Sequence, residues 1–334
     1  MKIINLHGTS LAVSSICLGT ANFGSGVDEA QAFAILDAFM EAGGTFLDTA
    51  NCYGKWNADK INCSERIIGR WLKSRRCGNR MVVATKGAHP EMGGDKKGAP
   101  RMDRQSISDD LDESMAALGI DQIPLYWLHR DDPRQPVGDI LELMETFVAS
   151  GRVCHYAASN FTLDRMKEAR AFAAKKGIRG FVAVQNKWSL AEPAPDAPKY
   201  GDPTMVASDD AFVAWHAETK TPAIPYNATA SGFFEKLDRL NPVLEGNTLS
   251  QEEFARLSKH VWDKMLTPRN LKIYAELRRM KSELNASMQT LSLAWFSSHP
   301  FDAIPITGVR NTAQLADALA AGNINFDGVR LSKS

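Results

Sequence analysis

The feature that most constrains this chain is an alternation of short apolar runs with longer amphipathic stretches, repeated from one end to the other. Within 104–118, for example, Ile107, Leu111, Met115 and Leu118 recur at helical spacings, and Gly119 marks a stop. Strands are expected at 15–18, 45–47, 81–85, 123–128, 153–157, 181–184, 222–225 and 303–305. Helices are expected at 28–42, 62–75, 104–118, 136–150, 162–176, 208–219, 270–298 in two pieces, and 311–321.

Eight strand-then-helix units predict an α/β fold in which a parallel sheet closes into a (β/α)8 TIM barrel. Before the first unit, residues 2–13 predict a short N-terminal β-hairpin that covers the barrel floor. Three long segments, 87–103, 191–207 and 229–267, follow predicted strands and therefore belong on the C-terminal face, where barrel active sites are built. No shift in composition marks a linker, so we expect residues 1–334 to form a single domain.

Charge and cysteine usage exclude several classes of protein. The chain has 39 Lys and Arg against 39 Asp and Glu, without the basic excess of a nucleic-acid binder. No apolar run is long enough to span a membrane, and the first residues lack an apolar leader. The five scattered cysteines form no C-x-x-C pair, which favours reduced thiols over disulfides or a zinc site. We therefore expect a cytoplasmic protein without nucleic-acid or membrane partners; the oligomeric state stays open.

Common nucleotide and hydrolase motifs are absent from the sequence. The chain has no G-x-G-x-x-G, P-loop, H-E-x-x-H or G-x-S-x-G pattern. Any bound nucleotide must therefore occupy a binding site that is built without these motifs.

Ionisable residues stand at or just after three neighbouring strand ends: Asp48, Tyr53, Lys86 and His129. In a barrel these ends meet at one opening. Asp48 follows an apolar run, so its carboxylate requires a cation, and Lys86 is the expected partner. An ammonium beside a phenol should lower the pKa of Tyr53 from about 10 towards working pH, which makes Tyr53 a candidate general acid. His129 can donate to a carbonyl oxygen.

With these residues in order around the barrel, the sequence resembles the aldo-keto reductase family over nearly its whole length. The resemblance rests on Asp48-Thr49-Ala50 to Tyr53-Gly54, Thr85-Lys86-Gly87, Leu128-His129, Ala158-Ser159-Asn160-Phe161, Gln185-Asn186 and Tyr226-Asn227. Two positions depart from the family pattern. Asn227-Ala228-Thr229 replaces Ser-Pro-Leu, and Asp317-Ala318 replaces Glu-Asn, which removes an amide that would read adenine.

The resemblance implies reduction of an aldehyde or ketone by NADPH, with NADH possible, and without a metal. Tyr53 would protonate the nascent alkoxide, Lys86 and Asp48 would tune it, and His129 would polarise the carbonyl. Trp56 and His129 would contact substrate.

The resemblance also implies the cofactor-binding residues. Ser159, Asn160 and Gln185 would hydrogen-bond the carboxamide, Tyr226 would stack on the nicotinamide, and Gly19 and Thr20 would line the same pocket. Segment 227–232, with Asn227, Ala228, Thr229, Ser231 and Gly232, would cover the pyrophosphate, and Gly308, Arg310 and Gln314 would hold the adenosine phosphate.

Polar, tryptophan-containing loops favour a sugar-type or other small polar carbonyl as substrate. Two alternatives stay open: an NAD(P)-dependent sugar or polyol dehydrogenase running in reverse, and a cofactor-sensing binding subunit. Some polar residues have simpler interpretations. Arg130-Asp131-Asp132 is expected to form a solvated turn with ion pairs, and His155 is expected to be a satisfied structural histidine.

Overall fold

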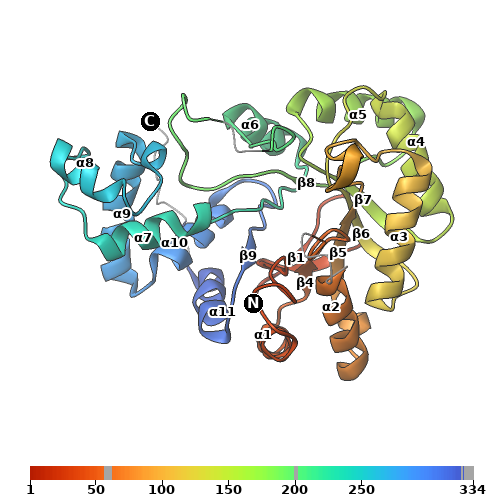
Figure 1. Cartoon of the computed structure of the whole chain (residues 1–334), viewed down its shortest axis with the longest axis horizontal. Helices are drawn as coiled ribbons and strands as arrows, with labels where there is room; N and C mark the ends of the chain where they lie inside the picture. The colour runs from red at the N-terminus through yellow and green to blue at the C-terminus, as the bar shows by residue number, and fades with distance from the viewer. Residues whose placement is uncertain (56–61, 199–201, 325, 327–334) are drawn as a thin grey trace.

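A computed structural model describes residues 1–55, 62–198, 202–324 and 326 of the chain. Its centre is a curled parallel sheet of seven strands in the order β8-β7-β6-β5-β4-β3-β9, with helices outside it (Figure 1). A separate antiparallel hairpin pairs β1 with β2. The strands are β1 Ile3–Asn5, β2 Ala12–Ser14, β3 Cys17–Gly19, β4 Phe46–Asp48, β5 Val82–Gly87, β6 Ile123–Leu128, β7 Val153–Ser159, β8 Val184–Gln185 and β9 Ile306–Gly308.

The helices follow the predicted pattern closely along the first half of the chain. In Figure 1, α2 to α5 lie along one side of the sheet, and α7 to α10 gather on the opposite side. The α-helices are α1 Glu29–Glu41, α2 Cys63–Arg75, α3 Arg104–Leu118, α4 Val137–Ala149, α5 Leu163–Lys176, α6 Asp210–Thr219, α7 Phe233–Leu240, α8 Gln251–Leu257, α9 Pro268–Leu284, α10 Met288–Ala294 and α11 Thr312–Leu319. None of the described helices is long and apolar enough to cross a membrane.

Helix α3 shows why the sequence folds locally as it does. Ile107, Leu111 and Leu118 are buried on one face, which accounts for the helical spacing of apolar residues. The Asp103 side chain accepts from the backbone N–H of Ser106 at the first turn, and Gly119 ends the helix at φ 67°. Asp103 is the N-cap, and the helix itself begins at Arg104, as predicted.

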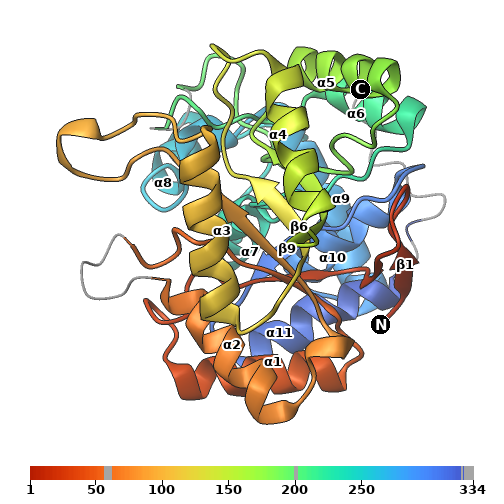
Figure 2. The ribbon, with the colours of Figure 1, turned by 90° about the vertical axis from the view of Figure 1, so that its right-hand side faces the viewer.

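The parallel register brings the ends of neighbouring strands to one level. Asp48 pairs with Ala84, Lys86 pairs with Trp127, and Gly87 pairs with Leu128. As a result, the side chains at the ends of β4, β5 and β6 emerge at the same rim. In Figure 2 the loop after β5 projects from the side of the molecule on which this rim lies, and β1 of the hairpin lies on the other side.

The predicted seventh strand, at 222–225, is wrong. That segment makes isolated parallel bridges to Val184 and to Ala303 instead of a ladder, so the sheet is a half-barrel of seven strands. Its backbone still accepts from Val184 N–H through the carbonyl of Pro222. Pro222 and Pro225 have no N–H to donate, which prevents a regular ladder through this segment.

Other predicted strand boundaries need correction. The run at 181–184 contributes only β8, Val184–Gln185, and the last strand begins after Pro305 as β9, Ile306–Gly308. The first two strands also begin later than predicted, as Cys17–Gly19 and Phe46–Asp48. These shifts carry the strand ends one to three residues further towards the rim.

The predicted hairpin and its place under the sheet are confirmed. Leu6, Leu11 and Val13 belong to a buried cluster with Phe46 and Trp127, which point inward from the strands. Burial of these apolar side chains ties the hairpin to the N-terminal end of the sheet. The opposite end is thereby left as the open rim.

Candidate active site

A buried ion pair forms the base of the candidate site. Lys86 Nζ lies 2.6 Å from Asp48 Oδ2 and donates to the Thr49 carbonyl at 2.7 Å. The Lys86 side chain is 0% exposed and that of Asp48 is 3% exposed. The expectation that Asp48 takes Lys86 as its cation is met by this contact. Gln185 holds the other carboxylate oxygen, because its Nε2 donates to Asp48 Oδ1 at 2.9 Å.

Tyr53 lies directly above this pair. Lys86 Nζ donates to the Tyr53 hydroxyl oxygen at 3.2 Å and lies 4.9 Å from the centre of its ring. Because an ammonium can only donate, the phenol oxygen is the acceptor, and its own proton takes no part in this bond. The arrangement couples a protonated phenol to a fixed positive charge.

The predicted lowering of the Tyr53 pKa is wrong for the protein without ligand. Burial raises the pKa of Tyr53 to about 12, although the positive charge of Lys86 acts in the opposite direction. Burial alone would lower the pKa of Lys86, but Asp48 and Tyr53 raise it above its usual value. Therefore the phenol is protonated and the ammonium charged at neutral pH. The pair is suited to donate a proton.

His129 is the fourth residue of the group. It follows the end of β6, its backbone N–H donates to the Gly87 carbonyl, and it is 8% exposed. The rings of His129 and Tyr53 lie edge to face with centroids 6.2 Å apart. Burial, and then the charge of Arg130, lower the pKa of His129 well below its usual range, so its ring is neutral at neutral pH. A neutral imidazole can donate one hydrogen bond to a carbonyl oxygen.

The residues predicted to bind a carboxamide lie at the next strand ends. Ser159 Oγ donates to the Gln185 carbonyl at 2.9 Å, and Asn160 Nδ2 donates to the His129 carbonyl at 3.2 Å. The Tyr226 hydroxyl donates to Asn160 Oδ1 at 2.8 Å, which fixes that half-buried ring beside the amide. Asn160 itself has φ 61°, in the left-handed region. These contacts place the four residues Ser159, Asn160, Gln185 and Tyr226 around one end of the sheet.

Segment 227–232, predicted to cover a pyrophosphate, has an irregular backbone. Asn227, Ala230 and Ser231 have φ of 55°, 49° and 56°, and Gly232 follows at 76°. Positive φ is uncommon for residues other than glycine and concentrates at ligand-binding segments. The side chain of Asn227 accepts from the Ser231 N–H at 2.8 Å and holds the turn together.

The predicted adenosine-phosphate site lies at the start of α11. Arg310 is exposed, its backbone N–H donates to Gln314 Oε1 at 2.9 Å, and Asn311 caps the helix. A guanidinium beside a helix N-terminus suits a phosphate. Gly308, at the end of β9, pairs with Gly19 at the end of β3, so both predicted glycines lie at the rim next to Thr20.

Asp317, which departs from the family pattern, has an internal role. Its Oδ2 accepts from Ser287 at 2.8 Å, and its backbone carbonyl accepts from Thr290 at 2.7 Å. It therefore joins α11 to the first turn of α10. Ala318 is fully buried, so neither residue offers the adenine-reading amide that the family pattern carries here.

Two further predictions have different outcomes. Trp56, the predicted substrate contact, lies outside the described residues. The prediction that Arg130-Asp131-Asp132 is exposed to solvent is wrong, because the exposed fractions of Arg130 and Asp132 are 5% and 4%. The predicted ion pairs are present. Arg130 contacts Asp202 at 3.0 Å across the rim, because a buried guanidinium needs a carboxylate.

One neighbour of the site was missed from sequence. His89 lies in the loop after β5, and its ring is 4.9 Å from that of His129, edge to face. Cys52 Sγ lies 3.6 Å from His129 Nδ1. His89 is only three residues beyond Lys86, but a loop gave no periodic signal that would orient its side chain.

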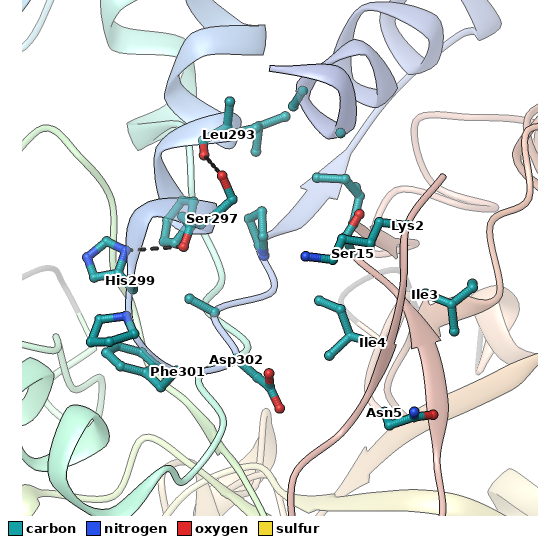
Figure 3. A pocket seen from close by; sticks show the side chains of 18 residues that line it. Lys2, Ile3, Ile4, Asn5, Ser15, Leu293, Ser297, His299, Phe301 and Asp302 are labelled. Atoms are coloured by element: carbon teal, nitrogen blue, oxygen red, sulfur yellow. Dashed lines mark hydrogen bonds between the residues drawn. The ribbon is translucent and has the colours of Figure 1, made fainter. Parts of the chain in front are cut away.

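A cavity of about 480 Å³ lies at the opposite end of the sheet, between the hairpin and the segment before β9 (Figure 3). Figure 3 shows Lys2, Ile4 and Ser15 on one wall and His299 and Asp302 on the other. The described residues that line it include none of those predicted for the site. The chemistry and this cavity therefore belong to different ends of the fold.

The curled parallel sheet, with a lysine–carboxylate pair and a tyrosine at its C-terminal rim, suits a barrel-type oxidoreductase. Residues 15–332 match the model of the aldo/keto reductase family, and the chain therefore belongs to this family. It is thereby an NAD(P)H-dependent oxidoreductase of a family that acts on small carbonyl compounds.

Similar proteins carry varied names. The chain is 31% identical to an uncharacterized oxidoreductase, YrpG, of Bacillus subtilis, over 98% of this chain and 93% of that one. It is 25% identical to a probable voltage-gated potassium channel subunit beta of Oryza sativa subsp. japonica, over 96% and 91%. It is 31% identical to norsolorinic acid reductase B of Aspergillus parasiticus, over 55% and 49%.

Proposed function

We propose that the chain reduces a small polar carbonyl, of the sugar-aldehyde type, to the alcohol with NADPH, and that Tyr53 is the general acid. The contact that carries the proposal is the donation from Lys86 Nζ to the Tyr53 oxygen at 3.2 Å above the buried Asp48 carboxylate. Bound NADPH supplies the hydride in such a reaction.

The residues of the chain supply the proton and the orientation. Tyr53, protonated at neutral pH because its pKa is raised to about 12, gives its proton to the alkoxide that forms. The Lys86 ammonium then stabilises the phenolate left behind. His129 donates to the same oxygen and holds the carbonyl towards Tyr53.

The cofactor-facing residues suit a nicotinamide dinucleotide. Ser159 and Asn160 present hydroxyl and amide groups beside the half-buried ring of Tyr226, on which a nicotinamide can stack. Exposed Arg310 at the start of α11 favours a 2′-phosphate, and hence NADPH. Because Ser287 donates to the Asp317 carboxylate, adenine is recognised without Asp317. The affinity for NADPH should therefore exceed the affinity for NADH by only a small factor.

A polar substrate fits the surroundings of His129. Arg130 joins Asp202 at 3.0 Å and donates from Nε to Thr204 at 2.9 Å, and His89 lies against His129. These side chains give the rim hydroxyl-binding groups near the reacting position. The reverse reaction, sugar or polyol oxidation, uses the same residues and requires the phenolate form of Tyr53.

The second candidate function is a cofactor-sensing binding subunit. One observation favours it: the similarity to a probable voltage-gated potassium channel subunit beta extends over 96% of this chain. Tyr53, Lys86, Asp48 and His129 are all present together in this chain, which favours the reductase.

Titration of the purified protein with NADPH and NADH, followed by fluorescence, tests both candidates. NADPH consumption is then measured with a panel of aldoses, short polar aldehydes and apolar aldehydes. Saturable NADPH binding with turnover of aldoses supports the reductase. Brisk turnover of apolar aldehydes alone contradicts the sugar-type substrate, binding without any turnover favours the sensing subunit, and absence of binding rejects both.

A further inference from the structure

Three side chains at the rim form a set of metal-binding groups. Cys52, His89 and His129 each direct one ligand atom to a common space, and these atoms all lie within 4.8 Å of one another. Cys52 precedes Tyr53, His89 lies in the loop after β5, and His129 follows β6. Three different segments therefore converge on one point.

The spacing of these atoms fits a tetrahedral ion. At metal–ligand distances of about 2.0 to 2.3 Å, tetrahedral ligand atoms lie about 3.4 to 3.7 Å apart. Cys52 Sγ and His129 Nδ1 are already 3.6 Å apart. His89 is the most exposed of the three, and its ligand atom lies within 4.8 Å of the other two.

The protonation of His89 is set for coordination. Its Nδ1 lies 2.8 Å from the Pro90 carbonyl, and since a carbonyl oxygen only accepts, Nδ1 carries the proton. Nε2 therefore has the lone pair that can bind a metal ion. A backbone carbonyl on the remote nitrogen is the usual support of a metal-binding histidine.

Charge does not prevent occupancy by a cation. The positive charges of Lys86 and Lys55 both act on Cys52, and each is paired with a carboxylate, Lys86 with Asp48 at 2.6 Å and Lys55 with Glu113 at 3.1 Å. Arg130 is likewise paired with Asp202. One sulfur and two imidazole nitrogens select Zn²⁺ and related ions over Mg²⁺ or Ca²⁺, which prefer oxygen ligands.

We propose that Cys52, His89 and His129 bind one Zn²⁺ ion, with the fourth position open to water, and that the bound ion inhibits carbonyl reduction. The ion binds His129 through Nδ1, the nitrogen next to Cys52, and thereby fixes the orientation of the ring that the proposed reaction uses to hold the carbonyl oxygen. The inhibitory consequence rests on the proposed function, whereas the binding rests only on the three side chains.

Binding is tested on the full chain with Co²⁺ as a spectroscopic probe, without cofactor or substrate. The wild type should bind one equivalent with a thiolate-to-cobalt band and the intense visible bands of tetrahedral Co²⁺, and Zn²⁺ should displace it. Cys52→Ser should lose the thiolate band. His89→Ala should weaken binding about 100-fold or more, beyond the 10- to 100-fold cost of losing an outer partner.

Cys154→Ser is the matched control, because Cys154 lies at the start of β7, near the other end of the sheet. It should leave the cobalt spectrum unchanged. Absence of the band in the wild type, or its persistence in Cys52→Ser, would overturn the proposed ion site.

Inhibition is measured separately. Zn²⁺ should raise the apparent KM for the carbonyl in the wild type at least tenfold, and Cys52→Ser should be resistant while it keeps its metal-free turnover. Equal inhibition of Cys52→Ser, or a bound ion without inhibition, would contradict the regulatory role. A chain that binds Co²⁺ but reduces no carbonyl would instead reject the proposed function and leave the ion site standing.

Discussion

The two ends of the sheet each hold a buried histidine, and the two histidines have different surroundings. His155, near the start of β7, contacts Arg179 at 2.6 Å through Nδ1 and Ser10 at 3.2 Å through Nε2. His129, after β6, has ring contacts to Cys52 Sγ at 3.6 Å and to the rings of Tyr53 and His89. Both rings are neutral, because burial lowers the pKa of each.

The difference separates structural from chemical use of the same side chain. His155 uses both nitrogens to fasten the hairpin and the 179 segment to the sheet, so it is committed to folding. The contacts of His129 are weak in comparison, and they leave the ring at the rim beside a proton donor.

The largest effect is expected from Lys86→Met. It removes the partner of both Asp48 and Tyr53, so turnover should fall by about three to four orders of magnitude. The unpaired buried carboxylate should also cost about 3 to 5 kcal/mol of unfolding free energy in urea. The double variant with Asp48→Asn should recover much of the stability but not the turnover. Near-normal turnover in Lys86→Met would contradict the role of the pair.

The two histidines should respond in opposite ways to substitution by leucine. His129→Leu should lower turnover about 100-fold or more through loss of a donor at the carbonyl oxygen, with little change in stability. His155→Leu should lower the unfolding free energy by about 1 to 3 kcal/mol and leave turnover within about twofold. Steady-state kinetics and urea unfolding are measured on both variants. A loss of turnover in His155→Leu together with a loss of stability in His129→Leu would contradict the contrast between the two histidines.

A smaller effect is expected from pH. The pKa of Tyr53 is raised to about 12, so its proton stays on throughout the neutral range and reduction should be flat between about pH 7 and about pH 9. Oxidation of an alcohol needs the phenolate, so its rate should rise about tenfold per pH unit over the same range. Single-turnover rates in both directions test this, and a decline in reduction centred near neutral pH would show a much lower pKa.

The sequence predicted the helices well because their signals are local. In α3 and α5 the apolar spacing, the capping side chains of Asp103 and Thr162, and the terminal glycines all lie within one segment. The seventh predicted strand failed for a reason that was also present in the sequence. Pro222 and Pro225 remove the donors that a ladder at 222–225 needs.

At the candidate site the identity of the residues was predictable and their electrostatics were not. Strand-end positions were enough to predict the contact between Asp48 and Lys86. Whether burial or the ammonium controls the pKa of Tyr53 depends on the depth of the site, and here burial has the larger effect. His89 was missed because only the folded loop brings it against His129.

The measurement that tests the central claim most directly compares Tyr53→Phe with Tyr156→Phe in single-turnover reduction under saturating NADPH. Tyr156 is a buried tyrosine whose hydroxyl donates to Glu145 at 2.7 Å, away from the rim. We expect Tyr53→Phe to bind NADPH normally and to reduce the carbonyl at least about 100-fold more slowly, while Tyr156→Phe stays within about twofold of the wild type. Equal rates in the two variants would contradict the assignment of Tyr53 as the proton donor.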